Sequence, residues 1–160
     1  MNRKIWAAIG GAAILAATAL PAFAVEESVS ATVTPVFIAV SIDDGVVNYG
    51  TLAVDTSQDT VTQGDTQAVK NDGTVAEDFL IRGQNSAAWV LAASAGDEEY
   101  KHEFTKTGTF GTALTTSNQS LDTNIALAGT TALDLKITTP TSTSASVTQT
   151  VDVTVVAVAN

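Results

Sequence analysis

The side chains best suited to acid–base or metal chemistry gather in one short stretch of the sequence. His102 is the only histidine in the chain, and Glu98, Glu99 and Glu103 lie close to it. A metal site or a general base could be built from these groups. A zinc site would have to rely on one histidine and carboxylates, because the chain has no cysteine. The simpler interpretation is a half-buried histidine on a strand, beside a solvated acidic loop.

Aspartates at predicted turns are the second candidate for chemistry. Calcium prefers several oxygen ligands from loops. The aspartates at or near predicted turns are Asp43, Asp44, Asp55, Asp59, Asp65 and Asp72. Aspartate also favours turns on its own account, and the sequence has no D-x-D-x-D-G loop. We therefore expect no cofactor. Ca²⁺ is the remaining candidate, and Asp43, Asp44 and Asp72 are the residues best placed to bind it.

Nucleophilic and glycosidic chemistry find no support in the residue pattern. A serine nucleophile needs a base and an orienting acid, whereas this chain has one histidine and no G-x-S-x-G motif. Paired carboxylates for glycoside hydrolysis are recognised by their separation in space, and no pair stands out in the sequence. We expect a protein that is not an enzyme and has no catalytic residues.

Residues Met1–Ala24 have the parts of a secretory signal peptide. Two basic residues precede an uncharged apolar run, which Pro21 ends, and Ala22-Phe23-Ala24 fits the small-x-small cleavage rule. The apolar run is short for a membrane span, and no cysteine follows it for lipid attachment. We predict cleavage and one domain over residues 25–160. That domain would be secreted to the exterior or the cell surface, with the periplasm as the alternative, and would not insert into a membrane.

Composition sets the class of the predicted mature chain. It carries five basic and seventeen acidic residues, a net charge of −12. So acidic a surface repels phosphate, which excludes nucleic acid as a partner and disfavours anionic lipid. Without cysteine, stability must come from packing rather than disulfides. The abundance of Thr, Val, Ala, Ser and Gly is typical of strands and turns.

Apolar residues recur with period two at short intervals, and turn signals such as Asn71-Asp72-Gly73 and Gly83–Ser86 separate them. The segments predicted as strands lie at 29–42, 47–54, 60–70, 79–81, 89–93, 100–104, 110–114, 121–127, 133–137 and 151–157. No stretch has the spacing of an amphipathic helix. About 8–10 short strands predict an all-β fold, an immunoglobulin-like antiparallel β-sandwich.

The predicted core consists of the apolar residues on the inward phase of these strands. They are Phe79, Ile81, Trp89, Leu91, Phe104, Leu135, Ile137, Val153 and Val155. Trp89 is the largest of them and would bury the most surface. On this assignment, truncation of Trp89 to alanine would cost about 3–5 kcal/mol of stability.

The segment Val25–Ile42 alternates apolar and polar residues with one break. Val29 and Val33 share one phase, Pro35 interrupts, and the following residues take the opposite phase. A proline within a strand must lie at an edge or a bulge, so we predict an edge strand that kinks at Pro35. Strand edges invite pairing with another chain. Self-association through Val25–Ile42 is therefore one hypothesis, and pairing within its own sandwich is the preferred alternative.

The run TQAVKNDGTVAEDFLIRG, through Asn71, Gly73 and Phe79, resembles a hairpin segment of immunoglobulin-like modules in bacterial surface proteins. The preceding VNYGTLAVDTSQD is similar to the run that opens such modules. In plan, as a signal peptide followed by a cysteine-free sandwich, the chain also resembles secreted single-domain β-proteins of bacteria and matrix-fibre subunits of the TasA and camelysin group. The resemblance implies an extracellular role without catalytic residues.

Two function classes follow from these observations. The first is a secreted structural or surface-interaction protein that assembles into an extracellular fibre or layer. The alternative is a small extracellular module that binds carbohydrate or another ligand. Sugar sites stack on exposed aromatic rings, and Tyr49, Trp89 and Phe104 all lie on apolar phases, so the alternative ranks second.

Overall fold

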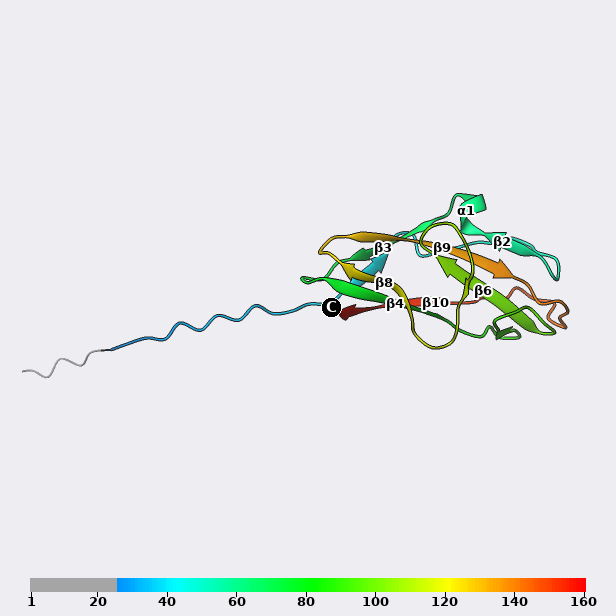
Figure 1. The fold of residues 1–160 in the computed structure, drawn as a ribbon. Coiled ribbons are helices and arrows are strands. Elements are labelled where there is room, and N and C mark those ends of the chain that lie inside the picture. Colours follow the sequence, from blue (N-terminus) through cyan, green and yellow to red (C-terminus); the bar gives the residue numbers. More distant parts are fainter. Residues whose placement is uncertain (1–25) are drawn as a thin grey trace, which may run out of the picture. The chain divides into compact units, whose positions relative to one another are not determined.

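The computed structural model describes residues 26–160, so the predicted signal peptide at Met1–Ala24 lies outside the described residues. The chain divides into two compact units, residues 1–33 and 34–160. The second unit is an all-β sandwich of two packed sheets (Figure 1), as the strand pattern predicts. No helix within residues 26–160 is long and apolar enough to cross a membrane.

Ten strands and one short helix make up the regular structure of the described residues. In chain order they are β1 (Val40–Ile42), β2 (Ser57–Asp59), α1 (Thr60–Gln63), β3 (Gln67–Asn71), β4 (Glu77–Gly83), β5 (Val90–Leu91), β6 (Glu99–Thr105), β7 (Thr112–Ala113), β8 (Gln119–Ile125), β9 (Thr130–Thr138) and β10 (Val153–Ala159).

The two sheets differ in width. The larger sheet runs in the order β1-β3-β9-β6-β5, with β2 also paired to β9 and β7 to β6. The smaller sheet has three strands, in the order β10-β4-β8. Every strand pair is antiparallel except one, because β5 runs parallel to β6 with Val90 opposite Glu99. The predicted antiparallel pairing therefore holds for every strand pair but that short one.

Alternating burial along β4 and β9 builds the core between the sheets. The seven residues of β4 alternate strictly between buried and half-buried, with Phe79 and Ile81 fully enclosed. The buried cluster contains Val69, Phe79, Ile81, Phe104, Leu114, Leu121, Leu133 and Leu135. The predicted core positions Phe79, Ile81, Phe104, Leu135 and Ile137 are buried, while Leu91, Val153 and Val155 are half-buried against that cluster.

Trp89 is the one predicted core residue that lies outside both the buried core and the strands. It ends the loop before β5 and is half-buried, with its indole Nε1 donating to Thr143 Oγ1 at 2.9 Å. Its backbone N–H donates to Ser86 Oγ at 2.8 Å, which closes a turn where the period-two pattern predicts a strand. Tyr100 is instead the largest fully buried side chain, and its hydroxyl donates to the backbone oxygen of Gln84.

The predicted polar strand over residues 60–70 is wrong in its first half, which forms α1. Asp59 caps the helix by accepting from the backbone N–H of Thr62 at 2.7 Å, and Gly64 ends it with φ at 72°. An aspartate at the N-cap and a glycine after the last turn are both ordinary helix signals. They went unrecognised because one turn of helix leaves no apolar period.

One further predicted strand is cut short, and another does not form. Residues 26–39 contain no strand, and β1 begins only at Val40. Residues 47–54 run irregularly, because Gly50 has φ at +73° and its N–H donates to the side chain of Asn48. Such a side-chain turn competes with strand pairing, although the apolar alternation around it is intact.

The turn at residues 71–73 stands where the sequence predicts it, but a buried side chain builds it. Asn71 is fully buried; its Nδ2 donates to the backbone oxygens of Val75 and Ile125 at 2.8 Å each, and its Oδ1 accepts from Gly73 N–H. None of the three turn residues has positive φ, so left-handed backbone is not what this turn requires.

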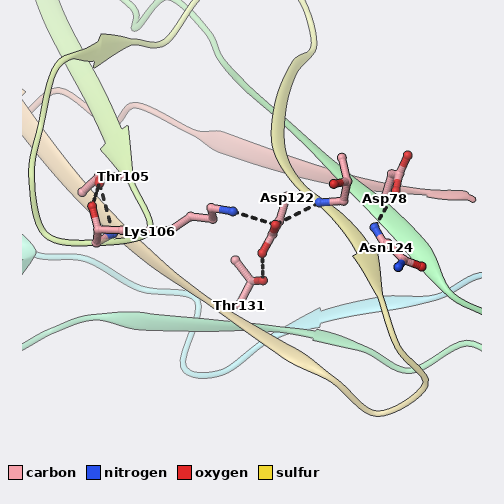
Figure 2. A network of polar contacts seen from close by, with 8 residues as sticks. Asp78, Thr105, Lys106, Asp122, Asn124 and Thr131 are labelled. Atoms are coloured by element: carbon pink, nitrogen blue, oxygen red, sulfur yellow. Dashed lines mark hydrogen bonds and ion pairs between the residues drawn. The ribbon is translucent and has the colours of Figure 1, made fainter.

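A polar cluster around Asp122 ties β8 in the smaller sheet to β9 in the larger one (Figure 2). The Asp122 carboxylate accepts from Lys106 Nζ at 2.6 Å, from the Thr131 hydroxyl and from the backbone N–H of Thr123. Partial burial raises the pKa of Asp122, but the bonds from Lys106 and Thr131 outweigh it and leave the pKa below its usual value. The sandwich is thus closed on its β8 side.

Candidate functional site

The side of the sandwich near β10 is open and holds a groove of about 910 Å³. Inward residues of β9 form one wall, namely Leu133, Leu135 and Ile137. The irregular segment 47–54, which does not form its predicted strand, lies along the groove, and residues 145–154 complete the lining. These three side chains are at most 6% exposed, so this wall of the groove is itself buried.

A pair of aromatic polar residues also lines the groove. The Tyr49 hydroxyl lies 2.9 Å from His102 Nε2, and the two rings meet edge to face with centroids 5.8 Å apart. His102 is 2% exposed, and its Nδ1 has no hydrogen-bond partner among the described residues. Burial lowers the pKa of His102 to about 4 and raises the pKa of Tyr49 well above its ordinary value. Both side chains are therefore neutral at physiological pH, and neither offers a charge.

Strand β10 borders the groove with a free edge. Within residues 26–160 it pairs only with β4, from Val153 opposite Gly83 to Ala159 opposite Glu77. Its other edge presents backbone N–H and C=O groups without a strand partner, and Val153 and Thr154 at its start line the groove. An unpaired strand edge is a surface suited to accepting another strand.

Residues 26–36, which we call the arm, form a segment with exposed apolar side chains. Val29 is 95% exposed and Val33 is 90% exposed. The arm continues into β1 through a fixed root, where Phe37 N–H donates to Thr74 Oγ1 at 2.9 Å and Ala39 N–H donates to Glu77 Oε1 at 2.9 Å. Apolar side chains this exposed, on an unpaired chain, lack the burial that stabilises a strand.

The strand geometry separates His102 from the acidic residues of the predicted acid–base cluster. Along β6, His102 faces the groove, while Glu103 on the next phase pairs with Lys101 at 2.9 Å. Glu98 accepts from the Thr143 hydroxyl and from Ser144, and these bonds hold the pKa of Glu98 below its usual value. The histidine is fully buried rather than half-buried, and of its acidic neighbours only Glu98 accepts bonds from residues 143 and 144.

The calcium candidates lie at two different places. Asp43 and Asp44 follow β1 at one end, where Asp43 N–H donates to the Ala68 backbone oxygen. Asp72 lies beside the other end of β1, where it pairs with Lys70 at 2.6 Å and accepts from the Ser41 hydroxyl. The bond from Lys70 lowers the pKa of Asp72. No group of three or more His, Asp or Glu side chains suited to a metal ion occurs in the described part of the chain.

Sequence reasoning missed the groove and its tyrosine. Tyr49 was placed on a return strand, and Trp89 was placed in the core, yet both line the groove. The one available signal was the Asn48–Gly50 pair, which predicts a turn inside an apolar stretch. The groove could not be foreseen, because it depends on where the irregular segments 47–54 and 145–154 lie.

No protein-family model matches this chain, and neither a curated protein nor a solved structure shows significant similarity to it.

Proposed function

We propose that this chain is a secreted, non-enzymatic structural protein that assembles with copies of itself into an extracellular fibre or layer. The observation that carries the proposal is the arm, in which Val29 and Val33 are almost fully exposed. A contiguous apolar surface exposed to water marks an interaction site. Here the surface is an alternating strand sequence, the form in which one chain adds to the sheet of another.

The charge and composition of the chain support the same role. Export by the predicted signal peptide would leave the arm at the start of the mature protein. The net charge of −12 over residues 25–160 keeps single copies soluble and disfavours anionic partners. The arm itself is uncharged from Ser28 to Val36, so a second copy can bury it without desolvating a charge.

Deletion of residues 26–34 tests the proposal. The full chain and the deletion variant are expressed with the signal peptide, and the secreted products are imaged by negative-stain microscopy and sized. We expect fibres or oligomers from the full chain and monomers from the deletion variant. The sandwich of the variant should stay folded, because the root at residues 37–39 is kept. Assemblies of equal size from both proteins would refute the proposal.

A second candidate function is supported by two aromatic side chains in the groove. Trp89 and Tyr49 are half-buried and line it, which suits stacking on a sugar ring or another flat ligand better than the sequence pattern suggested. Trp89 is the only tryptophan in residues 25–160, so its fluorescence reports on the groove. A change on titration with oligosaccharides would favour the binding module, and an unchanged spectrum would count against it.

A further inference from the structure

We infer that the groove beside β10 binds a neutral saccharide chain, with Trp89 and Tyr49 as the two rings on which its sugar units stack. The inference rests on the second candidate function proposed above, and it is independent of assembly through the arm. A groove of about 910 Å³ can hold a ligand larger than a single sugar. The class of ligand follows from the charge of the lining and from the way the two rings are held.

The lining of the groove carries almost no charge. Asp152 is its one acidic residue, and no lysine or arginine lines it. His102 is neutral at physiological pH, because burial lowers its pKa to about 4. Hydroxyls and amides, such as those of Thr51, Thr148 and Gln149, make up the other polar groups of the lining. An anionic ligand would find no counter-charge there, whereas sugar hydroxyls can donate to these groups and accept from them.

Trp89 is held in place by side chains that also line the groove. Its indole Nε1 donates to Thr143 Oγ1 at 2.9 Å, and the Thr143 hydroxyl donates to Glu98 Oε2 at 2.7 Å. Its backbone N–H donates to Ser86 Oγ, and the Ser86 hydroxyl donates to Gln149 Oε1 at 2.9 Å. Thr143 and Gln149 belong to the lining. Because the ring is oriented before a ligand arrives, binding costs little conformational entropy.

Tyr49 is held at another point of the lining. Its hydroxyl lies 2.9 Å from His102 Nε2, and its side chain packs against the core cluster. The His102 ring lies 6.2 Å from the Tyr100 ring between centroids, and the Tyr100 ring lies 6.2 Å from that of Trp89. A row of neighbouring rings therefore connects Tyr49 to Trp89 through two buried residues. The two ends of the row are half-buried and line the groove.

Two fixed rings in a neutral, hydroxyl-rich groove suit a saccharide chain. An aromatic ring has a partly negative face, which attracts the C–H groups on the face of a sugar ring. The hydroxyls around the edge of that sugar then meet the hydroxyls and amides of the lining. Because two other rings separate Tyr49 from Trp89, the two stacking positions suit successive units of one chain.

Calorimetric titration of the secreted full chain tests the inference. The neutral probes are maltohexaose, cellohexaose and hexa-N-acetylchitohexaose, and hexagalacturonate is the anionic probe. We expect saturable binding of at least one neutral hexasaccharide and no binding of hexagalacturonate. Trp89→Ala and Tyr49→Ala should each weaken the binding at least about tenfold, because each removes one stacking position. The variant that lacks residues 26–34 should bind as tightly as the full chain.

A blocking variant tests the groove without truncating a ring. Thr148 is exposed and lines the groove, so Thr148→Arg should obstruct the groove while leaving the core intact. Ser117→Arg is the matched control, because Ser117 is also exposed but lies outside the lining. We expect Thr148→Arg to abolish binding of the hexasaccharide and Ser117→Arg to leave it unchanged.

Four results would overturn the inference. They are the absence of binding to every neutral probe, equal binding of hexagalacturonate, binding that Thr148→Arg leaves unchanged, and loss of binding in the variant that lacks residues 26–34. The last result would mean that the arm, rather than the groove, forms the site. The first three leave the proposed assembly untouched, because the size of the arm-deletion variant tests that proposal by itself.

Discussion

Phe79 and Trp89 lie on similar apolar phases in the sequence but have different roles in the fold. Phe79 is fully enclosed between the sheets. Trp89 ends a loop that Ser86 closes, and its indole is tied to Thr143 at the groove. Residue type and position in the period-two pattern do not distinguish a core residue from a loop residue here, because the difference is whether the backbone at that position forms a strand.

Truncation of the two aromatics should therefore have unequal costs. Phe79→Ala leaves a cavity in the core and should lower the free energy of unfolding by about 3–5 kcal/mol. Trp89→Ala removes a half-buried ring and should cost no more than roughly half of that. Urea unfolding of the two variants measures both values. A larger loss for Trp89→Ala would place Trp89 back in the core.

His102 makes stability depend on pH. Its pKa is lowered from 6.5 to about 4 in the folded protein, because burial disfavours the charged ring. Between these values the unfolded chain binds a proton that the folded chain does not, so stability is complete above pH 6.5 and falls as the pH drops toward 4. The loss attributable to this group is at most roughly 3 kcal/mol.

A non-titrating variant isolates this contribution. His102→Gln keeps an amide within reach of Tyr49 and cannot be protonated. Its unfolding free energy, measured from pH 7 to pH 4.5, should fall less steeply than that of the wild-type protein, since the carboxylates are common to both. Identical slopes for the two proteins would mean that His102 is not held neutral by burial.

At the scale of the elements, the two sides of the sandwich are closed differently. On the β8 side Asp122 joins the sheets through Thr131, with Lys106 as a second partner (Figure 2). On the β10 side the irregular segments 47–54 and 145–154 line a groove instead.

Removal of the Asp122 carboxylate should weaken that closure. Asp122→Ala deprives the Thr131 hydroxyl and the Lys106 ammonium of their acceptor and should cost about 1–3 kcal/mol. Lys106→Met removes only the half-exposed ion pair and should cost less than about 1 kcal/mol. Thermal or urea unfolding compares the two variants. Equal costs would show that the bond to Thr131 contributes nothing.

Strands with clean alternation were predictable, and the segments between them were not. The patterns at 100–104 and 133–137 lie within β6 and β9, and the pattern at 151–157 overlaps β10 from Val153 on. Apolar and polar residues also alternate at 29–38 and 47–54, each with one phase break, yet neither segment forms a strand. Periodicity states which face of a strand would be apolar, while pairing is decided by the rest of the fold. The groove could not be predicted for the same reason, because segment 47–54, which lines it, alternates like a strand but has no partner strand.

At the scale of the whole molecule, the proposed self-association through the arm has to work against charge. Assembly must overcome the repulsion between copies that each carry a net charge of −12 over residues 25–160. Salt screens exposed charges over about 8 Å at 0.15 M ionic strength, whereas burial of the uncharged arm is insensitive to salt. Physiological ionic strength is thus the condition in which association should be tested.

The most direct measurement is the molar mass of the secreted protein by light scattering over a range of concentrations, with the variant that lacks residues 26–34 alongside. The account predicts that the mass of the full chain rises above that of a monomer as concentration increases. The variant should stay monomeric at every concentration. A full chain that remains a monomer throughout, or a variant that associates as strongly as the full chain, would contradict the account.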